Sequence, residues 1–269
     1  MTNSLLDSPS FSANPWQMSF GERAAIEGVL AQLRPELAIE IGTAEGGSLE
    51  RIAAHSERVI SFDLVEPQPH VKEIPNVELR TGDSHELLPQ ELERLAAAGT
   101  QVDFVMVDGD HSADGARQDL EDLLASPAIA NTVILAHDSL NQEVRQGLAA
   151  VPYAETAKVA HVDLDFVAGY VPAEGSMLGE CWGGLALIVV DESGRFGPAH
   201  AGRRPTMAPF SDLTWEAADA LRGNGAAAGP APEAELERQR ALVEEMQTSL
   251  SWRVTAPLRA ASARLRGRR

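Results

Sequence analysis

The sequence nearly lacks cysteine, since Cys181 is the only one among 269 residues. No disulfide can form within the chain, and a reducing, cytoplasmic setting is therefore expected. Long apolar runs are absent as well, so no segment has the composition of a transmembrane helix. The opening residues, Met1-Thr2-Asn3-Ser4, lack the basic and then apolar pattern of a signal peptide.

Basic residues are scarce. The chain has 22 Lys and Arg against 40 Asp and Glu, which gives a formal net charge of -18. General nucleic-acid binding needs a basic surface, so no nucleic-acid partner is expected. The tail from Ser251 onward is an exception, because it contains no acid and several arginines: Arg253, Arg259, Arg264, Arg266, Arg268 and Arg269.

What the chain does have is 44% hydrophobic residues, enough for one sizeable core with appendages. Apolar, strand-like runs alternate with amphipathic helical segments, which is typical of a doubly wound α/β domain with a mostly parallel sheet. The expected strands are 38–42, 58–63, 77–83, 102–107, 132–138, 159–167 and 185–190. The expected helices are 21–33, 48–55, 84–98, 113–124 and 141–150, and the prolines at 67, 69 and 75 predict a non-helical connection.

This pattern divides the chain into four parts. An irregular arm (1–20) precedes the α/β domain (21–200), and a helix with a flexible Gly, Ala and Pro linker follows (201–232). The last part (233–269) is a charged helix with a basic tail. Its apolar positions form a weak heptad seam, which leaves a coiled coil and a solvated single helix equally open.

Ionisable residues stand directly after two of the expected strands. Asp108-Gly109-Asp110-His111 follows the run 102–107, and the run 132–138 ends in His137-Asp138. In open parallel sheets, ligands bind just beyond the carboxyl ends of the strands. The alternative is a helix-capping Asp and a solvated His, which look the same in sequence.

The loop after the first strand also has the composition of a binding site. Gly42, Gly46 and Gly47 let the backbone turn tightly and approach a ligand. Ala44 stands where a dinucleotide-binding motif needs its second glycine, so the loop does not have that spacing. Glu40 suits a cationic ligand group, and Asp63, at the end of the second strand, lies where a ribose-binding acid is expected.

These segments resemble class I S-adenosylmethionine-dependent methyltransferases over residues 20 to 195. The resemblance is carried by Glu40-x-Gly42-x-x-x-Gly46, by Asp63 and by Gly82-Asp83-Ser84. It implies a seven-stranded Rossmann-like sheet in which Asp63 binds the ribose hydroxyls and the Gly82-Asp83-Ser84 segment lies beside the adenine. It further implies that the methionine part is held by Glu40, Gly42, Thr43, Ala44, Gly46 and Ser48.

The later strand ends resemble the metal-dependent sugar O-methyltransferases of macrolide biosynthesis, the related cephalosporin-hydroxylase group and, more distantly, catechol O-methyltransferase. The resemblance implies that Asp108, His137 and Asp138 bind a divalent cation. Carboxylate ligands suit Mg²⁺ or Mn²⁺. These families usually have an acid at the position of His137, and this departure favours Mn²⁺ or another transition metal.

The resemblance also implies a reaction. A divalent cation lowers the pKa of a sugar hydroxyl, and His111 matches the proposed general base of the macrolide sugar enzymes. Asp108 would act beside His111 as cation ligand, while Asp110 either orients His111 or is a turn residue. The predicted protein is an O-methyltransferase acting on a sugar hydroxyl in the biosynthesis of a glycan, such as a polysaccharide, or of a glycosylated natural product. Oxidative, hydroxylase-like chemistry and a non-catalytic, cofactor-binding scaffold are the alternatives.

The terminal segment 249–259 resembles a short motif of bacterial glycosyltransferases and methyltransferases of cell-surface glycan assembly. Its Trp, Leu and Arg residues suit the inner membrane face or a glycan-assembly partner, and a disordered solvating tail is the alternative. The acceptor is expected to be a small molecule or a glycan. A homo-oligomer is left open.

Overall fold

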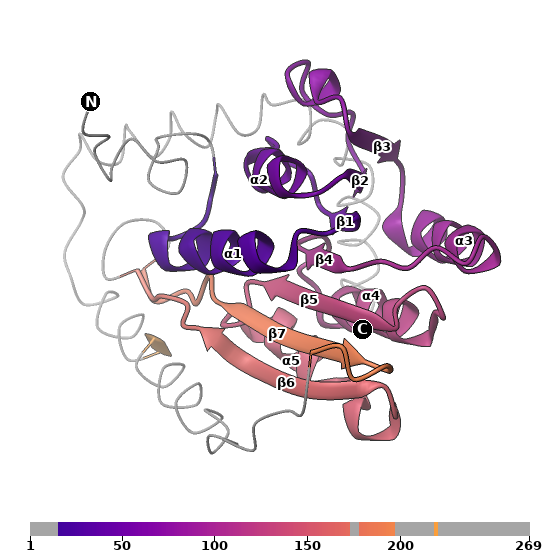
Figure 1. Cartoon of the computed structure of the whole chain (residues 1–269). Coiled ribbons are helices and arrows are strands. Elements are labelled where there is room, and N and C mark those ends of the chain that lie inside the picture. Colours follow the sequence, from indigo (N-terminus) through magenta and orange to yellow (C-terminus); the bar gives the residue numbers. More distant parts are fainter. Residues whose placement is uncertain (1–15, 173–177, 197–217, 220–269) are drawn as a thin grey trace, which may run out of the picture.

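The computed structural model describes residues 16–172, 178–196 and 218–219. Its centre is a seven-stranded sheet in the order β3-β2-β1-β4-β5-β7-β6 (Figure 1). β7 runs antiparallel to both of its neighbours, and the pairs from β3 to β5 are parallel. The mostly parallel α/β sheet predicted from the sequence is therefore confirmed. The strands are β1 (Leu37–Ile41), β2 (Arg58–Asp63), β3 (Val77–Thr81), β4 (Phe104–Val107), β5 (Asn131–His137), β6 (Val159–Val167) and β7 (Leu185–Asp191).

Five α-helices and two short 3-10 helices accompany these strands within the described residues; α1 precedes β1, and the others lie between strands. One 3-10 turn lies between Pro69 and Pro75, so the prediction of a fully non-helical connection was wrong there. The prolines flank the turn and leave its own N–H groups free to bond, and Val71 N donates to the carbonyl of Gln68. The helices are α1 (Phe20–Leu33), α2 (Gly47–His55), α3 (Ser84–Ala97), α4 (Ala113–Ala125), α5 (Gln142–Ala150), η3 (Val71–Glu73) and η4 (Tyr153–Glu155).

The helices cover both faces of the sheet, and β4 shows why a central strand is apolar on both of its faces. Side chains alternate between the faces of a strand. Val105 and Val107 pack into the core cluster formed with α3, α4 and α5. Phe104 and Met106 pack into the cluster formed with α1 and α2. All four are buried, as expected for a parallel strand with helices on both sides.

The strand order brings the candidate residues to one edge. After β3 the chain crosses the sheet to β4, which pairs with β1, so the order of the strands reverses between these two. Ile41 pairs with Val107, and Val107 pairs with Ala136, so the loops that follow β1, β4 and β5 begin at one level. This is the switch point at which open α/β sheets bind ligands.

The predicted appendages lie largely outside the described residues. This applies to residues 1–15, to the linker and to the charged helix and basic tail (233–269). Of the predicted helix 211–221, only Ala218 and Asp219 are described; they are helical, and Ala218 packs with Leu140 and Cys181. Within the described part of the chain, no helix is long and apolar enough to cross a membrane.

Candidate active site

The loop between β1 and α2 turns through left-handed backbone conformations. Gly42 has φ +95° and Gly46 has φ +83°, and Ala44 shares this region at φ +45°. A Cβ on Gly42 would lie 2.0 Å from the carbonyl oxygen of Asp108. The glycine therefore lets this loop pack directly on the end of β4, where the second group of candidate residues begins.

Asp63 holds this loop in place. Its Oδ2 accepts hydrogen bonds from the backbone N–H groups of Thr43 (2.9 Å) and Ala44 (2.8 Å). Its Oδ1 accepts from the N–H of Val65 at 2.8 Å. These bonds explain how Ala44 is kept in an unfavourable conformation. Ribose binding by Asp63 stays a prediction, and Oδ1 retains acceptor capacity for it.

Glu40 is completely buried beneath the same loop. Ser48 Oγ donates to its Oε1 at 2.6 Å, and Ser61 Oγ donates to its Oε2 at 2.7 Å. Thr43 Oγ1 joins this network at 2.7 Å from Ser61 Oγ. Burial raises the pKa of Glu40 to about 8 despite the two serine hydrogen bonds. At neutral pH the carboxyl group is therefore largely protonated until a positive charge comes close.

The segment after β3 begins the next helix. Asp83 is the N-cap of α3 and accepts from the N–H of His85 at 2.9 Å. Gly82 has φ +153°, and a Cβ there would lie 2.8 Å from Leu87 Cδ1. Ser84 Oγ lies 3.4 Å from Asp119 Oδ1. Asp83 therefore caps α3, and the adenine contact predicted for this segment stays a prediction.

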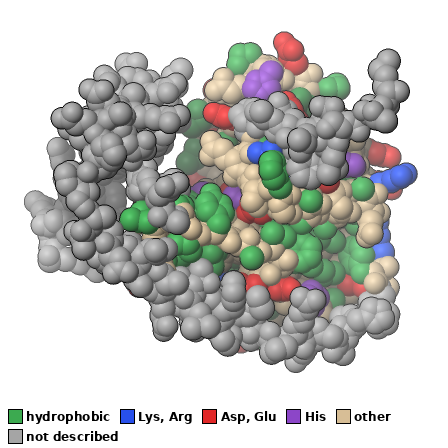
Figure 2. All heavy atoms as spheres, turned by 90° about the vertical axis from the view of Figure 1, so that its left-hand side faces the viewer, with side chains coloured by type: hydrophobic (Ala, Val, Ile, Leu, Met, Phe, Trp, Pro, Cys, Tyr) green, Lys and Arg blue, Asp and Glu red, His purple; other side chains and the backbone are tan. Residues whose placement is uncertain are grey.

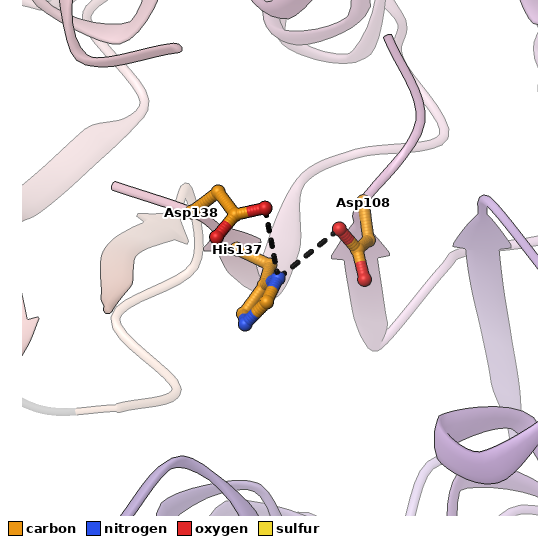
Figure 3. A group of neighbouring side chains, drawn as sticks. All are labelled: Asp108, His137 and Asp138. Carbon is orange, nitrogen blue, oxygen red and sulfur yellow. Dashed lines mark hydrogen bonds and ion pairs between the residues drawn. The ribbon is translucent and has the colours of Figure 1, made fainter. Parts of the chain in front are cut away.

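Asp108, His137 and Asp138 converge where β4 and β5 end (Figure 3). Nδ1 of His137 lies 3.1 Å from Asp108 Oδ1 and 3.6 Å from Asp138 Oδ2. One ligand atom from each residue lies within 4.8 Å of those of the other two. The three residues are therefore close enough together to share one cation. We call these three residues the acidic cluster.

The donor set of the acidic cluster fits a divalent cation. Neighbouring ligands of a six-coordinate ion with bonds of about 2.1 Å are roughly 3 Å apart, and the Nδ1–Oδ1 distance of 3.1 Å is close to this. Two carboxylates and one imidazole are a mixed oxygen and nitrogen set that Mn²⁺ and other transition metals accept more readily than Mg²⁺.

Asp138 is held in this arrangement by its backbone and by a glycine pair. It adopts φ +55°, an uncommon conformation for a residue other than glycine. The N–H of Gly183 donates to its Oδ1 at 2.6 Å, so its Oδ2 remains facing His137. Gly183 and Gly184 themselves have φ +69° and +87°. The glycine pair thus lets the backbone approach the carboxylate of Asp138.

His137 carries the positive charge that keeps the acidic cluster together. Burial alone would lower the pKa of His137, but Asp108, Glu22 and Asp138 raise it well above its usual value. Burial would likewise raise the pKa of Asp108, whereas His137 and His111 hold it below its usual range. A protonated imidazole thus occupies the place of a cation, and a metal ion would have to displace the proton on Nδ1.

His111 reaches the same carboxylates from the loop after β4. Its Nε2 lies 3.3 Å from Asp108 Oδ1 and 3.4 Å from Asp138 Oδ2. The hydrogen bond to Asp108 raises the pKa of His111; burial opposes this, and the charge of Asp138 reinforces it. The side chain is 42% exposed, and its ring meets the edge of Trp182 at a centroid distance of 6.2 Å. His111 therefore connects the acidic cluster with solvent.

Asp110 accepts from the N–H of Ser112 at 2.9 Å and from its hydroxyl at 3.0 Å. Ser112 is in turn the N-cap of α4. These bonds favour the interpretation of Asp110 as a turn residue.

Sequence reasoning missed two residues that line the site. Glu22 of α1 lies 3.1 Å from Nε2 of His137, and Trp182 lies against His111. Glu22 belongs to a capping box with Ser19, and this pattern accounts for a Glu at that position without any ligand.

Viewed from the side toward which β5 runs, the molecule carries histidine and acidic side chains bordered by hydrophobic ones (Figure 2).

Residues 39–139 match a family described as a methyltransferase domain. This stretch spans the end of β1 through β5 and the acidic cluster, so the resemblance to methyltransferases is confirmed there. Comparison with curated proteins gives no match.

Several solved structures resemble this chain at low identity. The O-methyltransferase from Bacillus cereus in complex with SAH is 17% identical, with 67% of this chain and 84% of that chain covered and a TM-score of 0.46. TomG, an O-methyltransferase from Streptomyces achromogenes involved in tomaymycin synthesis, is 17% identical over 65% and 81%, with a TM-score of 0.47.

MycE, a methyltransferase of the mycinamycin biosynthetic pathway in complex with Mg, SAH and mycinamycin VI, is 14% identical and has a TM-score of 0.47. The alignment covers 80% of this chain but only 58% of MycE. At such identities the reaction has to be argued from the residues of this chain.

Proposed function

We propose that this chain is an S-adenosylmethionine-dependent O-methyltransferase assisted by a divalent cation. The observation that carries the proposal is the acidic cluster at the end of β4 and β5, directly beside the glycine loop that follows β1. The match of residues 39–139 to a methyltransferase domain supports the cofactor. A methyl donor and a cation-binding site at one switch point are what metal-assisted methyl transfer needs.

We assign the cofactor to the edge formed by β1, β2 and β3. The loop from Gly42 to Ser48 would receive the methionine part, with Glu40 beneath it turning into an anion as the ammonium group approaches. Asp63 would bind ribose through the lone pair left on Oδ1, and the Asp83-Ser84 segment would lie beside the adenine. Asp63 maintains the geometry of this loop through its bonds to the backbone of Thr43 and Ala44.

We assign cation binding to Asp108, His137 and Asp138. A bound cation would lower the pKa of the acceptor hydroxyl. Asp138 keeps Oδ2 toward the cluster because Gly183 holds its other oxygen. Mn²⁺ is the expected ion, since an imidazole replaces a third carboxylate.

His111 is the proposed general base. Its Nε2 faces the acidic cluster while its ring is part-exposed, so it can reach an acceptor that enters from solvent. Bound S-adenosylmethionine would supply the methyl group to the acceptor oxygen, with its sulfur as the leaving group, and the imidazole of His111, once neutral, would take the hydroxyl proton. Alignment of the two reactants supplies much of the remaining acceleration.

A sugar hydroxyl in the biosynthesis of a glycan or a glycosylated natural product is the proposed acceptor. The support from this chain is Trp182, whose ring stands beside His111 and offers an apolar surface with a polar tip next to the base. Cytoplasmic localisation, a membrane or glycan-assembly partner for residues 233–269, and a homo-oligomer stay predictions.

One observation favours a second candidate function. Two imidazoles and two carboxylates face one another here, and two histidines with one carboxylate form the iron site of many oxygenases. Product mass separates the two reactions, because methyl transfer adds CH₂ whereas hydroxylation adds one oxygen atom.

The decisive variant for the proposed function is Asp138→Ala. We expect its affinity for Mn²⁺ to fall by more than about 100-fold, since outer-shell changes alone cost 10–100-fold, and metal-dependent turnover to be lost. Calorimetric affinity for S-adenosylmethionine should change little. Asp114→Asn is the matched control, because Asp114 is exposed on the first turn of α4.

Two results would contradict the proposed function. If the wild-type chain binds neither S-adenosylmethionine nor S-adenosylhomocysteine, it is not a methyltransferase. If turnover survives both Asp138→Ala and a chelator, the reaction does not use a cation at this site.

A further inference from the structure

Glu22 is buried in the candidate active site although it is far from the other residues in sequence. It precedes His137 by 115 positions and lies outside the stretch that matches the methyltransferase domain. Its side chain is 1% exposed, and that of His137 is 7% exposed. Burying a carboxylate this completely is costly unless its oxygens are bonded, so the contacts of Glu22 indicate what it does.

Both oxygens of Glu22 have partners. Oε2 accepts from the N–H of Ser19, as part of the capping box that begins α1. Oε1 accepts from the N–H of Gly184 and lies 3.1 Å from Nε2 of His137. A capping box needs only the first of these bonds. The two bonds of Oε1 therefore require an explanation beyond the helix end.

The position of the imidazole ring provides that explanation. Nε2 and Nδ1 lie on opposite sides of the ring, and a neutral imidazole carries its proton on one of them. When Nε2–H donates to Glu22, the lone pair of Nδ1 faces Asp108 Oδ1 and Asp138 Oδ2. Without an acceptor at Nε2, the contacts of Nδ1 with Asp108 and Asp138 would favour the tautomer that carries its proton on Nδ1, and the broad terminal torsion of His would leave the ring rotation to those contacts alone.

The glycine pair connects Glu22 with a second residue of the acidic cluster. The N–H of Gly184 bonds Glu22, and the N–H of Gly183 bonds Oδ1 of Asp138. A Cβ on Gly183 would lie 2.9 Å from Oε1 of Glu22. Consecutive peptide groups before β7 thus fix two carboxylates, and a side chain at Gly183 would displace one of them.

We propose that Glu22 is a positioning residue for the cation site: by accepting the Nε2–H of His137 it aims Nδ1 at the space between Asp108 and Asp138. The inference rests on the proposed function, because it assumes that the acidic cluster binds a cation. It adds that α1, which precedes the matched domain, is required for the cation affinity of the site. Carboxylate–histidine–metal arrangements of this kind tune metal affinity in other proteins.

Two substitutions separate the hydrogen bond from the charge. Glu22→Asp keeps the charge but shortens the side chain by one methylene, which withdraws the oxygen from Nε2. Glu22→Gln removes the charge but keeps an oxygen acceptor at the same reach. Ser19→Ala is the matched control, because it removes the other half of the capping box (Ser19 Oγ accepts from Glu22 N at 3.3 Å) and leaves the contact with His137.

The affinity of full-length protein for Mn²⁺ alone is measured by calorimetry, and the visible absorption of bound Co²⁺ reports the ligand set. We expect Glu22→Asp to weaken Mn²⁺ binding about 10–100-fold and to change the Co²⁺ spectrum. Glu22→Gln should restore affinity to within about tenfold of wild type. Ser19→Ala should lower the melting temperature of the metal-free protein and leave both metal readouts unchanged.

The outcomes distinguish this inference from the proposed function. If wild-type protein binds no Mn²⁺, or if Asp138→Ala binds it equally well, the proposed cation site fails. If that site holds but Glu22→Asp binds Mn²⁺ as wild type does, the positioning role is refuted. It is also refuted if Glu22→Gln is as weak as Glu22→Asp, because charge and not the hydrogen bond would then be responsible.

Discussion

Replacing Glu40 by Gln should change how the stability of the protein depends on pH. Burial raises the pKa of Glu40 from 4.5 to about 8. Between these values the folded protein retains a proton that the unfolded chain has released. Stability therefore falls as pH rises: the contribution of Glu40 is fully present below pH 4.5 and is lost by about pH 8.

The size of the effect follows from the shift. At roughly 1.4 kcal/mol per pKa unit, the change from 4.5 to about 8 corresponds to about 5 kcal/mol of unfolding free energy. Gln has the shape of the protonated side chain. Its NH₂ can donate to Ser61 Oγ, which in turn can donate to Thr43 Oγ1, and its oxygen can accept from Ser48 Oγ. The variant should therefore keep the network and lose the titration.

Urea unfolding between pH 5 and 9 measures the difference. Relative to wild type, the free energy of unfolding of Glu40→Gln should rise by several kcal/mol as pH rises from 4.5 to about 8, and it should not rise further above that pH. Glu45→Gln is the matched control, since Glu45 lies in the same loop but is exposed, and its stability should stay parallel to wild type. Parallel curves for Glu40→Gln and wild type would refute the reasoning.

Gly42 in the loop after β1 and Gly28 within α1 lead to opposite predictions. Gly42→Ala should lower the free energy of unfolding by at least about 3 kcal/mol, because its Cβ would lie 2.0 Å from the carbonyl oxygen of Asp108 and because φ +95° disfavours an L side chain by roughly 1–2 kcal/mol. Binding of S-adenosylmethionine, measured by titration, should be lost as well. Gly28→Ala, where nothing lies within 4 Å, should instead gain about 0.5–1 kcal/mol in chemical denaturation. For the opposite face of the sheet, Arg145→Ala should lower the free energy of unfolding by about 3–5 kcal/mol, because it removes the guanidinium that bonds the largely buried carboxylate of Asp165 at 2.8 and 3.0 Å; an unchanged urea midpoint would contradict this.

The sheet and most of the acidic cluster could be predicted because their causes are local. Apolar runs, either continuous or alternating with polar residues, predicted the ends of each strand to within one or two residues. Asp108, His137 and Asp138 follow two such runs, and parallel neighbours necessarily place their carboxyl ends together. Once the strand order is assumed, these three residues are expected at one edge of the sheet, whereas the orientation of Asp138 also depends on its φ of +55° and on the N–H of Gly183.

Glu22 could not be predicted in this way, because its contact depends on packing between elements distant in sequence. The first turn of α1 has to lie over the carboxyl end of β5. The glycine pair before the antiparallel β7 has to direct the N–H of Gly184 to Glu22. No periodicity encodes that arrangement. The burial of Glu40 and the backbone bonds of Asp63 were missed for the same reason, since both depend on the path of the loop between them.

The replacement of an acid by His137 and the burial of Glu22 have a common electrostatic explanation. With a carboxylate at position 137, four acids would meet in a space where His137 now lies 3.1 Å from both Asp108 and Glu22. A single divalent cation would leave such a group with excess negative charge, and Glu22 would have no donor opposite Oε1 except Gly184. An imidazole donates one hydrogen bond to Glu22 and offers one lone pair to the cation. The buried Glu22 is therefore a hydrogen-bond partner of residue 137, whereas it would repel a carboxylate at that position. The histidine that departs from the expected ligand set is thus the residue through which α1 joins the site.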